Sequence, residues 1–260
     1  MLSRLVTRAA SASALVLIAA ATQAATLIGL TADNKLVKID TGTMAASAPM
    51  SINGADKVVG IDVRPADGKL WGLTSTGRLL TIDPANGKAT LGAMLKEKVA
   101  LGERPVVDFN PVADRLRVIA TGGVSLRINV ETGDTVVDKP LNFDAADASK
   151  DKKPMVVAGG YTNSSKGSKA TELFHVDAGT GTLVLQSPPN DGVLKTRGAL
   201  GVTGLADAVL DIDNESEGKN TVWMVSGGWL FTIDIANGKA TKVGQIKGLT
   251  GKLVDIAVWK

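Results

Sequence analysis

Ile82-Asp83-Pro84-Ala85-Asn86-Gly87 is one of five copies of a short phrase in which a β-branched residue and Asp or Asn lead into a glycine turn. The other copies begin at Ile39, Ile128, Val176 and Ile233. The turn glycines Gly42, Gly87, Gly133, Gly181 and Gly238 lie 45, 46, 48 and 57 residues apart. A repeat of this length is typical of one four-stranded β-propeller blade and is unlike a helical array.

The residues around Gly87 show what one repeat contains. Short apolar runs over residues 58–63, 70–74, 79–83 and 88–94 predict four strands, and Pro, Asp, Asn, Ser and Gly cluster between them. Four strands joined by three tight turns form an antiparallel meander. The chain therefore predicts an all-β fold built from such units.

The two ends of the chain together supply about one further repeat. Residues 253–259 resemble the first strand of a unit, because Val254-Asp255-Ile256 imitates Ile61-Asp62-Val63, and residues 26–49 resemble the other three strands. Pairing the two ends in one blade removes exposed sheet edges, which favour aggregation. We expect a five-bladed β-propeller closed by its N- and C-terminal strands. A sandwich, or an irregular six-bladed ring that uses residues 142–153, is the alternative.

The N-terminus has the pattern of a cleaved signal peptide. Arg4 and Arg8 precede an apolar run over residues 9–21, and small residues lead to a cleavage site after Ala24. We therefore expect a signal peptide over residues 1–24, a single domain over residues 25–260, and a periplasmic or extracellular product. The chain has no cysteine, so no disulfide stabilises it.

Charge excludes one class of partner. The formal net charge of +3 includes Arg4 and Arg8, which leaves about +1 on the mature chain and no basic stripe. Nucleic acid is therefore not an expected partner. We expect no membrane-spanning segment and a monomer.

Three aspartates recur at one place in the first strand of a repeat. Asp62, Asp108 and Asp255 share this position, and Asp211 or Asp213 is a looser candidate in another repeat. Innermost strands of a propeller line its axis, so these carboxylates are candidate ligands for a cation such as calcium. Alternatively, each accepts hydrogen bonds from backbone amides in the turn that follows it, as the Asp-x-x-Pro sequences at Asp62 and Asp108 suggest, and we favour this interpretation because no feature of the sequence fixes a metal geometry.

Other polar residues give weaker indications of chemistry. Residues 211–217 are acidic but lack the glycine and glutamate of a calcium loop, which favours a solvated turn. His175 is the only histidine, and no Gly-x-Ser-x-Gly elbow is present, so no catalytic residue is expected.

Arginines and tryptophans favour roles between the blades. Two successive repeats contain four arginines that could bind a carboxylate or a phosphate: Arg64, Arg115, Arg117 and Arg127. Ion pairs between blades are the favoured interpretation. Trp71 and Trp223 occupy matching second-strand positions, where packing between blades is expected.

The run Gly60-Ile61-Asp62-Val63-Arg64-Pro65-Ala66-Asp67-Gly68-Lys69-Leu70-Trp71-Gly72-Leu73 resembles a family of exported bacterial proteins known as a domain of unknown function, DUF4394. The segments at residues 107–118 and 188–192 strengthen the resemblance, which extends over nearly all of the mature chain. It implies a propeller-like repeat fold and secretion, and it brings no activity, cofactor or catalytic residue.

Two functions fit these observations. The first is an exported, non-catalytic binding or scaffold propeller whose partner is a protein, a small ligand or cell-envelope material. The second is a secreted hydrolase or lyase of propeller type, in which Asp62 and Asp108 act with an axial cation. The favoured function is the first, because carboxylates that repeat from blade to blade are what a structural role produces.

Overall fold

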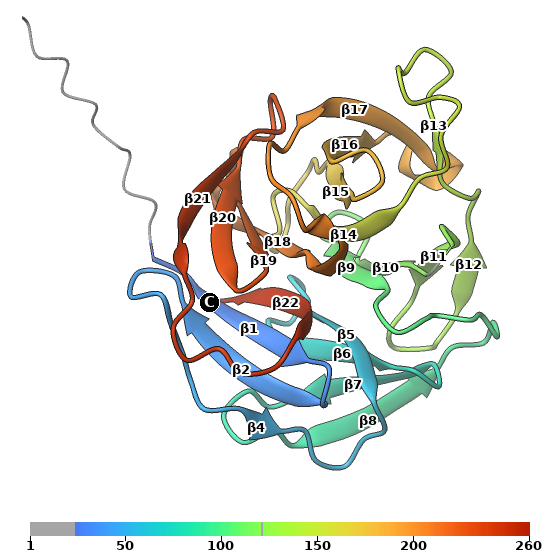
Figure 1. Ribbon diagram of the computed structural model, residues 1–260. Coiled ribbons are helices and arrows are strands. Elements are labelled where there is room, and N and C mark those ends of the chain that lie inside the picture. The colour runs from blue at the N-terminus through green and yellow to red at the C-terminus, as the bar shows by residue number, and fades with distance from the viewer. Residues whose placement is uncertain (1–23, 121) are drawn as a thin grey trace, which may run out of the picture.

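The computed structural model describes residues 24–120 and 122–260, and it shows five antiparallel sheets arranged around one axis (Figure 1). The predicted five-bladed β-propeller is confirmed. Of the expected signal peptide only Ala24 falls within the described residues. No helix in the described ranges has the length and apolar character needed to cross a membrane.

Each blade runs from an inner to an outer strand. Blade 1 contains β22 (Leu253–Trp259), β1 (Thr26–Thr31), β2 (Lys35–Asp40), β3 (Ala45–Ala46) and β4 (Met50–Ser51). Blade 2 contains β5 (Val58–Val63), β6 (Leu70–Thr74), β7 (Arg78–Ile82) and β8 (Ala89–Met94). Blade 3 contains β9 (Val106–Asn110), β10 (Arg115–Ile119), β11 (Ser125–Ile128) and β12 (Thr135–Val137).

The remaining two blades follow the same order. Blade 4 contains β14 (Val156–Tyr161), β15 (Leu173–Asp177), β16 (Thr182–Gln186) and β17 (Val193–Ala199), with β13 (Asn142–Phe143) at its outer edge. Blade 5 contains β18 (Val209–Ser216), β19 (Lys219–Ser226), β20 (Trp229–Ile233) and β21 (Ala240–Gln245). Two 3-10 turns, η1 (Pro189–Asp191) and η2 (Leu205–Asp207), lie in the connections on either side of β17.

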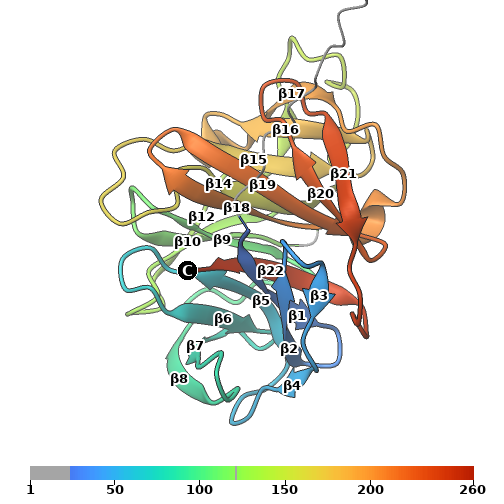
Figure 2. The same cartoon turned by 90° about the vertical axis from the view of Figure 1, so that its left-hand side faces the viewer.

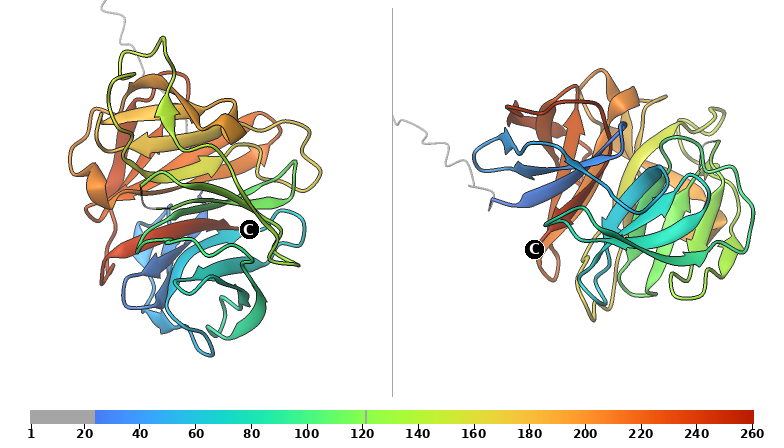
Figure 3. Two further views of the ribbon diagram at one scale, coloured as in Figure 1. Left: turned by 90° about the vertical axis from the view of Figure 1, so that its right-hand side faces the viewer. Right: turned by 90° about the horizontal axis from the view of Figure 1, so that it is seen from below.

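The ring closes between the two ends of the chain. Strand β22 pairs antiparallel with β1, with Leu27 opposite Val258 and Gly29 opposite Ile256. Figures 2 and 3 show the red C-terminal strand beside the blue N-terminal strands. The inner strands β22, β5, β9, β14 and β18 each contact the next around the axis. The predicted pairing of the terminal strands is therefore confirmed.

The repeated glycines are required by backbone geometry. Gly87 and Gly133 have φ of 74°, and a Cβ at these positions would lie 2.2 Å from the Ser51 carbonyl oxygen and 1.9 Å from that of Met94. Only glycine combines a left-handed backbone with so close an approach to the preceding blade. In the corresponding turn of blade 1, between β2 and β3, the left-handed residue is Met44, with φ of 56°, so Gly42 is not the equivalent turn residue.

Two segments differ from the expected arrangement. Residues 142–153 form no sixth blade, because β13 instead pairs parallel with β17 at the edge of blade 4. Most of the acidic stretch 211–217 belongs to β18 rather than to a solvated turn, and Asp211 and Asp213 are buried. The predicted solvated turn is therefore wrong. The acidic composition suggested exposure to solvent, but polar residues on an inner strand face the axis of the ring.

The core consists of five apolar clusters, one at each junction between neighbouring blades. Trp71 packs in the cluster between blades 2 and 3, where its ring meets Phe109 edge-on at 6.4 Å. Trp223 packs in the cluster between blades 5 and 1. Both tryptophans therefore pack between blades, as expected.

Arginine side chains connect neighbouring blades at two of the junctions. Arg64 of blade 2 pairs with Asp114 and Glu131 of blade 3. Arg117 of blade 3 pairs with Asp138 at 2.6 Å and also donates to Asn190 and to the Tyr161 hydroxyl of blade 4. The expected bridging role holds for these two. Arg127 pairs with Asp138 of its own blade, and Arg115 donates to the carbonyls of Ala113 and Asp114 in its own turn.

Candidate functional site

Four aspartates meet at the axis of the ring. Asp62 of β5, Asp108 of β9, Asp211 of β18 and Asp255 of β22 occupy the inner strands of four blades and are at most 7% exposed. We call them the axial carboxylates. Blade 4 has Gly160 at this place, and a Cβ there would lie 3.3 Å from Asp108 Oδ2. The sequence thus identified three of the four, and Asp211 was its looser candidate.

Each axial carboxylate accepts a backbone N–H from the inner strand of the next blade. The donors are Ile61 to Asp255 (2.9 Å), Phe109 to Asp62 (2.6 Å), Tyr161 to Asp108 (2.9 Å) and Val258 to Asp211 (2.5 Å). A second oxygen of Asp62, Asp211 and Asp255 accepts the N–H of the following residue. The carboxylates therefore connect the blades to one another, and the junction from blade 4 to blade 5, where Gly160 stands, has no such bond.

Three of these carboxylates are close enough to share a cation. One oxygen from each of Asp62, Asp108 and Asp211 lies within 4.8 Å of the others. Carboxylate oxygens are the ligands that calcium prefers. The Asp255 carboxylate is not part of this set of three. Asp213 forms an ion pair with Lys260 instead, with 3.0 Å between Lys260 Nζ and Asp213 Oδ1.

Burial dominates the protonation of the axial carboxylates. It raises the pKa of all four, and those of Asp62, Asp108 and Asp255 rise well above the usual range for aspartate. Neighbouring carboxylates raise the pKa of Asp62 and Asp108 further, while the backbone N–H donors oppose the rise. Carboxylates this close do not all ionise at once: either some of them stay protonated, or a cation neutralises part of the charge.

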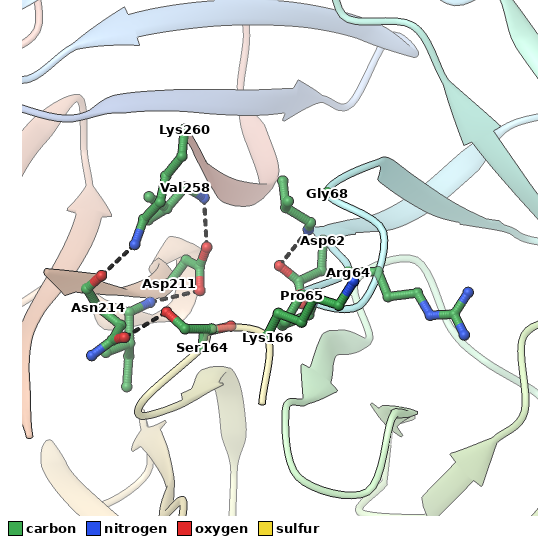
Figure 4. A pocket seen from close by; sticks show the side chains of 13 residues that line it. Asp62, Arg64, Pro65, Gly68, Ser164, Lys166, Asp211, Asn214, Val258 and Lys260 are labelled. Atoms are coloured by element: carbon green, nitrogen blue, oxygen red, sulfur yellow. Dashed lines mark hydrogen bonds between the residues drawn. The ribbon is translucent and has the colours of Figure 1, made fainter. Parts of the chain in front are cut away.

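A pocket of about 220 Å³ opens above the carboxylates at the end of the axis where the inner strands finish (Figure 4). We call it the axial pocket. Asp62 and Asp211 face each other across it, and its walls come from blades 1, 2, 4 and 5. Lys166, Ser164, Asn214 and Lys260 stand around it, while the Arg64 guanidinium points away toward its partners in blade 3.

The rim formed by blade 4 is held in place by an asparagine cluster. The Oδ1 atom of Asn163 accepts the Gly218 N–H at 3.0 Å, and the backbone N–H of Asn163 donates to Asn220 Oδ1 at 2.7 Å. Ser165 Oγ donates to Asn214 Oδ1 at 2.6 Å. These bonds fix the loop carrying Ser164 and Lys166 against blade 5, at the junction that lacks an axial carboxylate.

Arg104 stands at the opposite end of the axis. It precedes β9, and its two Nη groups donate to the carbonyls of Ala206 (2.7 Å) and Ala208 (2.9 Å), just before β18. Burial lowers the pKa of Arg104, and the charges of Asp207 and Asp255 oppose this. Because blades 3 and 5 are not neighbours in the ring, Arg104 connects loops on opposite sides of blade 4.

His175 lies in β15, outside the axial pocket. Its Nε2 hydrogen-bonds to Gln186 Oε1 at 2.7 Å, and burial lowers its pKa to about 4. In the axial pocket Ser165 donates to an asparagine, and no histidine lines the wall formed by the described residues. The site therefore offers hydrogen-bonding and charged groups from several blades.

The sequence pointed to the axis but not to the rim. Sequence reasoning did not identify six residues as part of a site: Asn163, Ser164, Lys166, Asn214, Lys260 and Arg104. Their only signal was the position of Ser164 and Lys166 in a polar loop between two strands, and loops of this kind frequently carry binding residues.

These features define a closed five-bladed β-propeller with an acidic axis and one polar axial pocket. The sequence profile of the domain of unknown function DUF4394 matches residues 35–257. The chain belongs to this family, and the resemblance noted in the sequence is confirmed. No curated protein matches the sequence.

Solved structures with a similar fold share little sequence with this chain. A protein of unknown function from Bacteroides thetaiotaomicron has a TM-score of 0.51 at 14% identity, over 92% of this chain and 66% of that one. A protein of unknown function from Bacteroides caccae has a TM-score of 0.45 at 12% identity, over 92% and 100% of the two chains. An auxiliary nutrient binding protein from Bacteroides ovatus has a TM-score of 0.43 at 14% identity, over 83% and 57%. At such identities the likeness concerns the fold alone.

Proposed function

We propose that this protein is exported and acts as a non-catalytic binding propeller that holds a small polar ligand in the axial pocket. The observation that carries the proposal is the construction of that pocket, to which four of the five blades contribute. Sites built between elements of a rigid scaffold are the usual place for ligands, and a volume of about 220 Å³ suits a ligand smaller than a typical drug molecule.

The lining indicates the chemistry of the ligand. Lys166 and Ser164 offer donors at the rim, and the axial carboxylates Asp62 and Asp211 form the floor. Both carboxylates already accept backbone N–H groups, so they offer their remaining lone pairs to a ligand donor. A small compound that carries both hydrogen-bond donors and an anionic or carbonyl group matches this arrangement.

A thermal-shift screen of amino acids, small organic acids and sugars, followed by calorimetry on the compounds that stabilise the protein, tests the proposal. Lys166→Gln should weaken binding about tenfold, because a charge-assisted hydrogen bond is lost. Lys169→Gln is the matched control, since Lys169 is exposed in the same loop but does not line the pocket. Equal affinities of the two variants, or no compound that binds, would contradict the assignment.

One observation supports a second candidate, a cation-dependent hydrolase or lyase. The oxygens of Asp62, Asp108 and Asp211 lie within 4.8 Å of one another, so one calcium ion could be ligated by all three. In this case calcium should raise the melting temperature of the wild-type protein and leave that of Asp108→Asn unchanged. If the carboxylates only connect blades, neither calcium nor a chelator moves the melting curve.

Export is tested separately. The n-region and h-region predict that the mature chain begins near Ala25 and is recovered outside the cytoplasm. N-terminal sequencing of the protein from its native host gives this result directly, and retention of Met1 would contradict it.

A further inference from the structure

A second cavity, of about 390 Å³, lies at the opposite end of the ring from the axial pocket, between blades 3 and 4. We call it the lateral pocket. It is lined by the start of β14, the end of β10 and the segment before β9, and its volume falls in the range of small-molecule sites. The axial pocket shares none of its lining residues.

Positive charge in the lateral pocket has no acidic counterpart in its wall. Arg104 and Lys153 line it, and none of the described lining residues is Asp or Glu. The carboxylate nearest to Arg104 is that of Asp207, at 3.6 Å, and Asp207 lies closer to Lys252, at 2.6 Å. Arg104 is half-buried, with a side chain 18% exposed, and a partly desolvated cation without a carboxylate at hydrogen-bond distance favours an anion in its vicinity.

One donor of Arg104 has no acceptor in the part of the chain that the structure describes. Both Nη groups donate to backbone carbonyls of the loop before β18, whereas Nε is buried and has no partner among the described residues. A buried polar hydrogen without an acceptor is uncommon in native proteins, so Arg104 is incompletely satisfied by the protein groups around it. Lys153 is exposed and adds a mobile ammonium at the rim.

The other walls of the lateral pocket are apolar. Ile119 and Leu141 belong to the buried cluster between blades 3 and 4, and Val156 packs against the same cluster. Met155 is 56% exposed, which makes it one of the few large apolar side chains at the surface. Exposed apolar surface beside a cavity is typical of a binding site.

From this combination we infer that the lateral pocket binds a small amphipathic carboxylate, with the carboxylate against Arg104 and Lys153 and the apolar body against Ile119, Leu141 and Met155. Guanidinium and ammonium groups bind carboxylates through charge-assisted hydrogen bonds. The apolar wall then selects against small anions that lack a hydrocarbon body, because such anions have no apolar surface to bury against it.

Calorimetry of the purified mature protein with hexanoate, hexylamine and hexan-1-ol tests this inference. Hexanoate should bind with one site per chain, and the amine and the alcohol should bind at least about tenfold more weakly, since they lack the negative charge. Acetate should also bind more weakly than hexanoate, because it lacks the apolar body. No hexanoate binding at about 10 mM, or equal binding of the amine, would overturn the inference.

Variants locate the site. Lys153→Gln should weaken hexanoate binding about tenfold, whereas Lys152→Gln, one residue away and outside the lining, should leave it unchanged. Lys153 carries this test because Arg104 also connects two loops, so that its replacement would disturb the fold. If Lys152→Gln and Lys153→Gln bind equally, or if Lys166→Gln in the axial pocket abolishes binding, the lateral pocket is not the site.

Discussion

Asp62 should be more important for stability than Asp108, because it accepts more backbone hydrogens. Asp62 accepts the buried Phe109 N–H and the half-buried Val63 N–H, each at 2.6 Å. Within residues 24–120 and 122–260, the one backbone N–H that Asp108 accepts is that of Tyr161, at 2.9 Å. A buried donor left without an acceptor costs about 1–3 kcal/mol. Asp62→Ala should therefore lower the free energy of unfolding by about 2–4 kcal/mol, and Asp108→Ala by about 1–3 kcal/mol.

Both alanine variants remove one buried carboxyl, so relief of desolvation and repulsion affects them in the same direction. The larger loss expected for Asp62→Ala therefore reflects the additional N–H bond of Asp62. Asp62→Asn retains one acceptor oxygen and should lose less stability than Asp62→Ala.

Urea unfolding followed by tryptophan fluorescence measures these changes, and Trp223 is a buried reporter. In thermal unfolding the loss of about 2–4 kcal/mol for Asp62→Ala should lower the melting temperature by roughly 4–16 °C for a domain of this size. If Asp62→Ala were as stable as wild type, or more stable than Asp108→Ala, the reasoning that these carboxylates connect the blades would fail.

Three further predictions concern the ring and its buried polar groups. Deleting residues 253–260 removes β22 and uncovers the edge of β1, so the truncated protein should aggregate or unfold; a soluble product with an unchanged melting temperature would exclude the closed ring. Arg117→Met should cost about 3 kcal/mol in urea unfolding because Arg117 is buried and paired with Asp138, whereas Arg115→Met should cost less than about 1 kcal/mol; equal losses would count against the buried network. The pKa of His175 is lowered from 6.5 to about 4, so the stability that it contributes is present above pH 6.5 and is lost as the pH falls toward 4, by up to about 3 kcal/mol. His175→Gln should lack this acid-side loss, and parallel pH profiles of the two proteins would refute it.

Repetition explains why the architecture and most of the axis were predictable. Asp62, Asp108 and Asp255 stand at one place in a strand that recurs, and inner strands of a propeller face its axis. Asp211 was less certain, because the polar residues after it resemble a turn although they continue strand β18. The terminal strands were paired correctly because each end is shorter than one repeat.

The rim and the opposite end of the axis could not be predicted in the same way. Asn163 meets Asn220 across 57 positions of sequence, and Arg104 meets Ala206 and Ala208 across more than 100. These contacts exist only once the ring has closed and brought loops of different blades together. No local pattern of residues encodes such a meeting, which depends on the curvature of the whole ring.

A crystal structure of the purified mature protein grown with calcium and the compound that best stabilises it would test the central claim most directly. The account predicts electron density for the compound between Lys166, Asn214 and the axial carboxylates, with the Asp62 and Asp211 oxygens still bonded to the Phe109 and Val258 N–H groups. An ion bound at about 2.3–2.6 Å from oxygens of Asp62, Asp108 and Asp211 would contradict it and favour the cation-dependent enzyme.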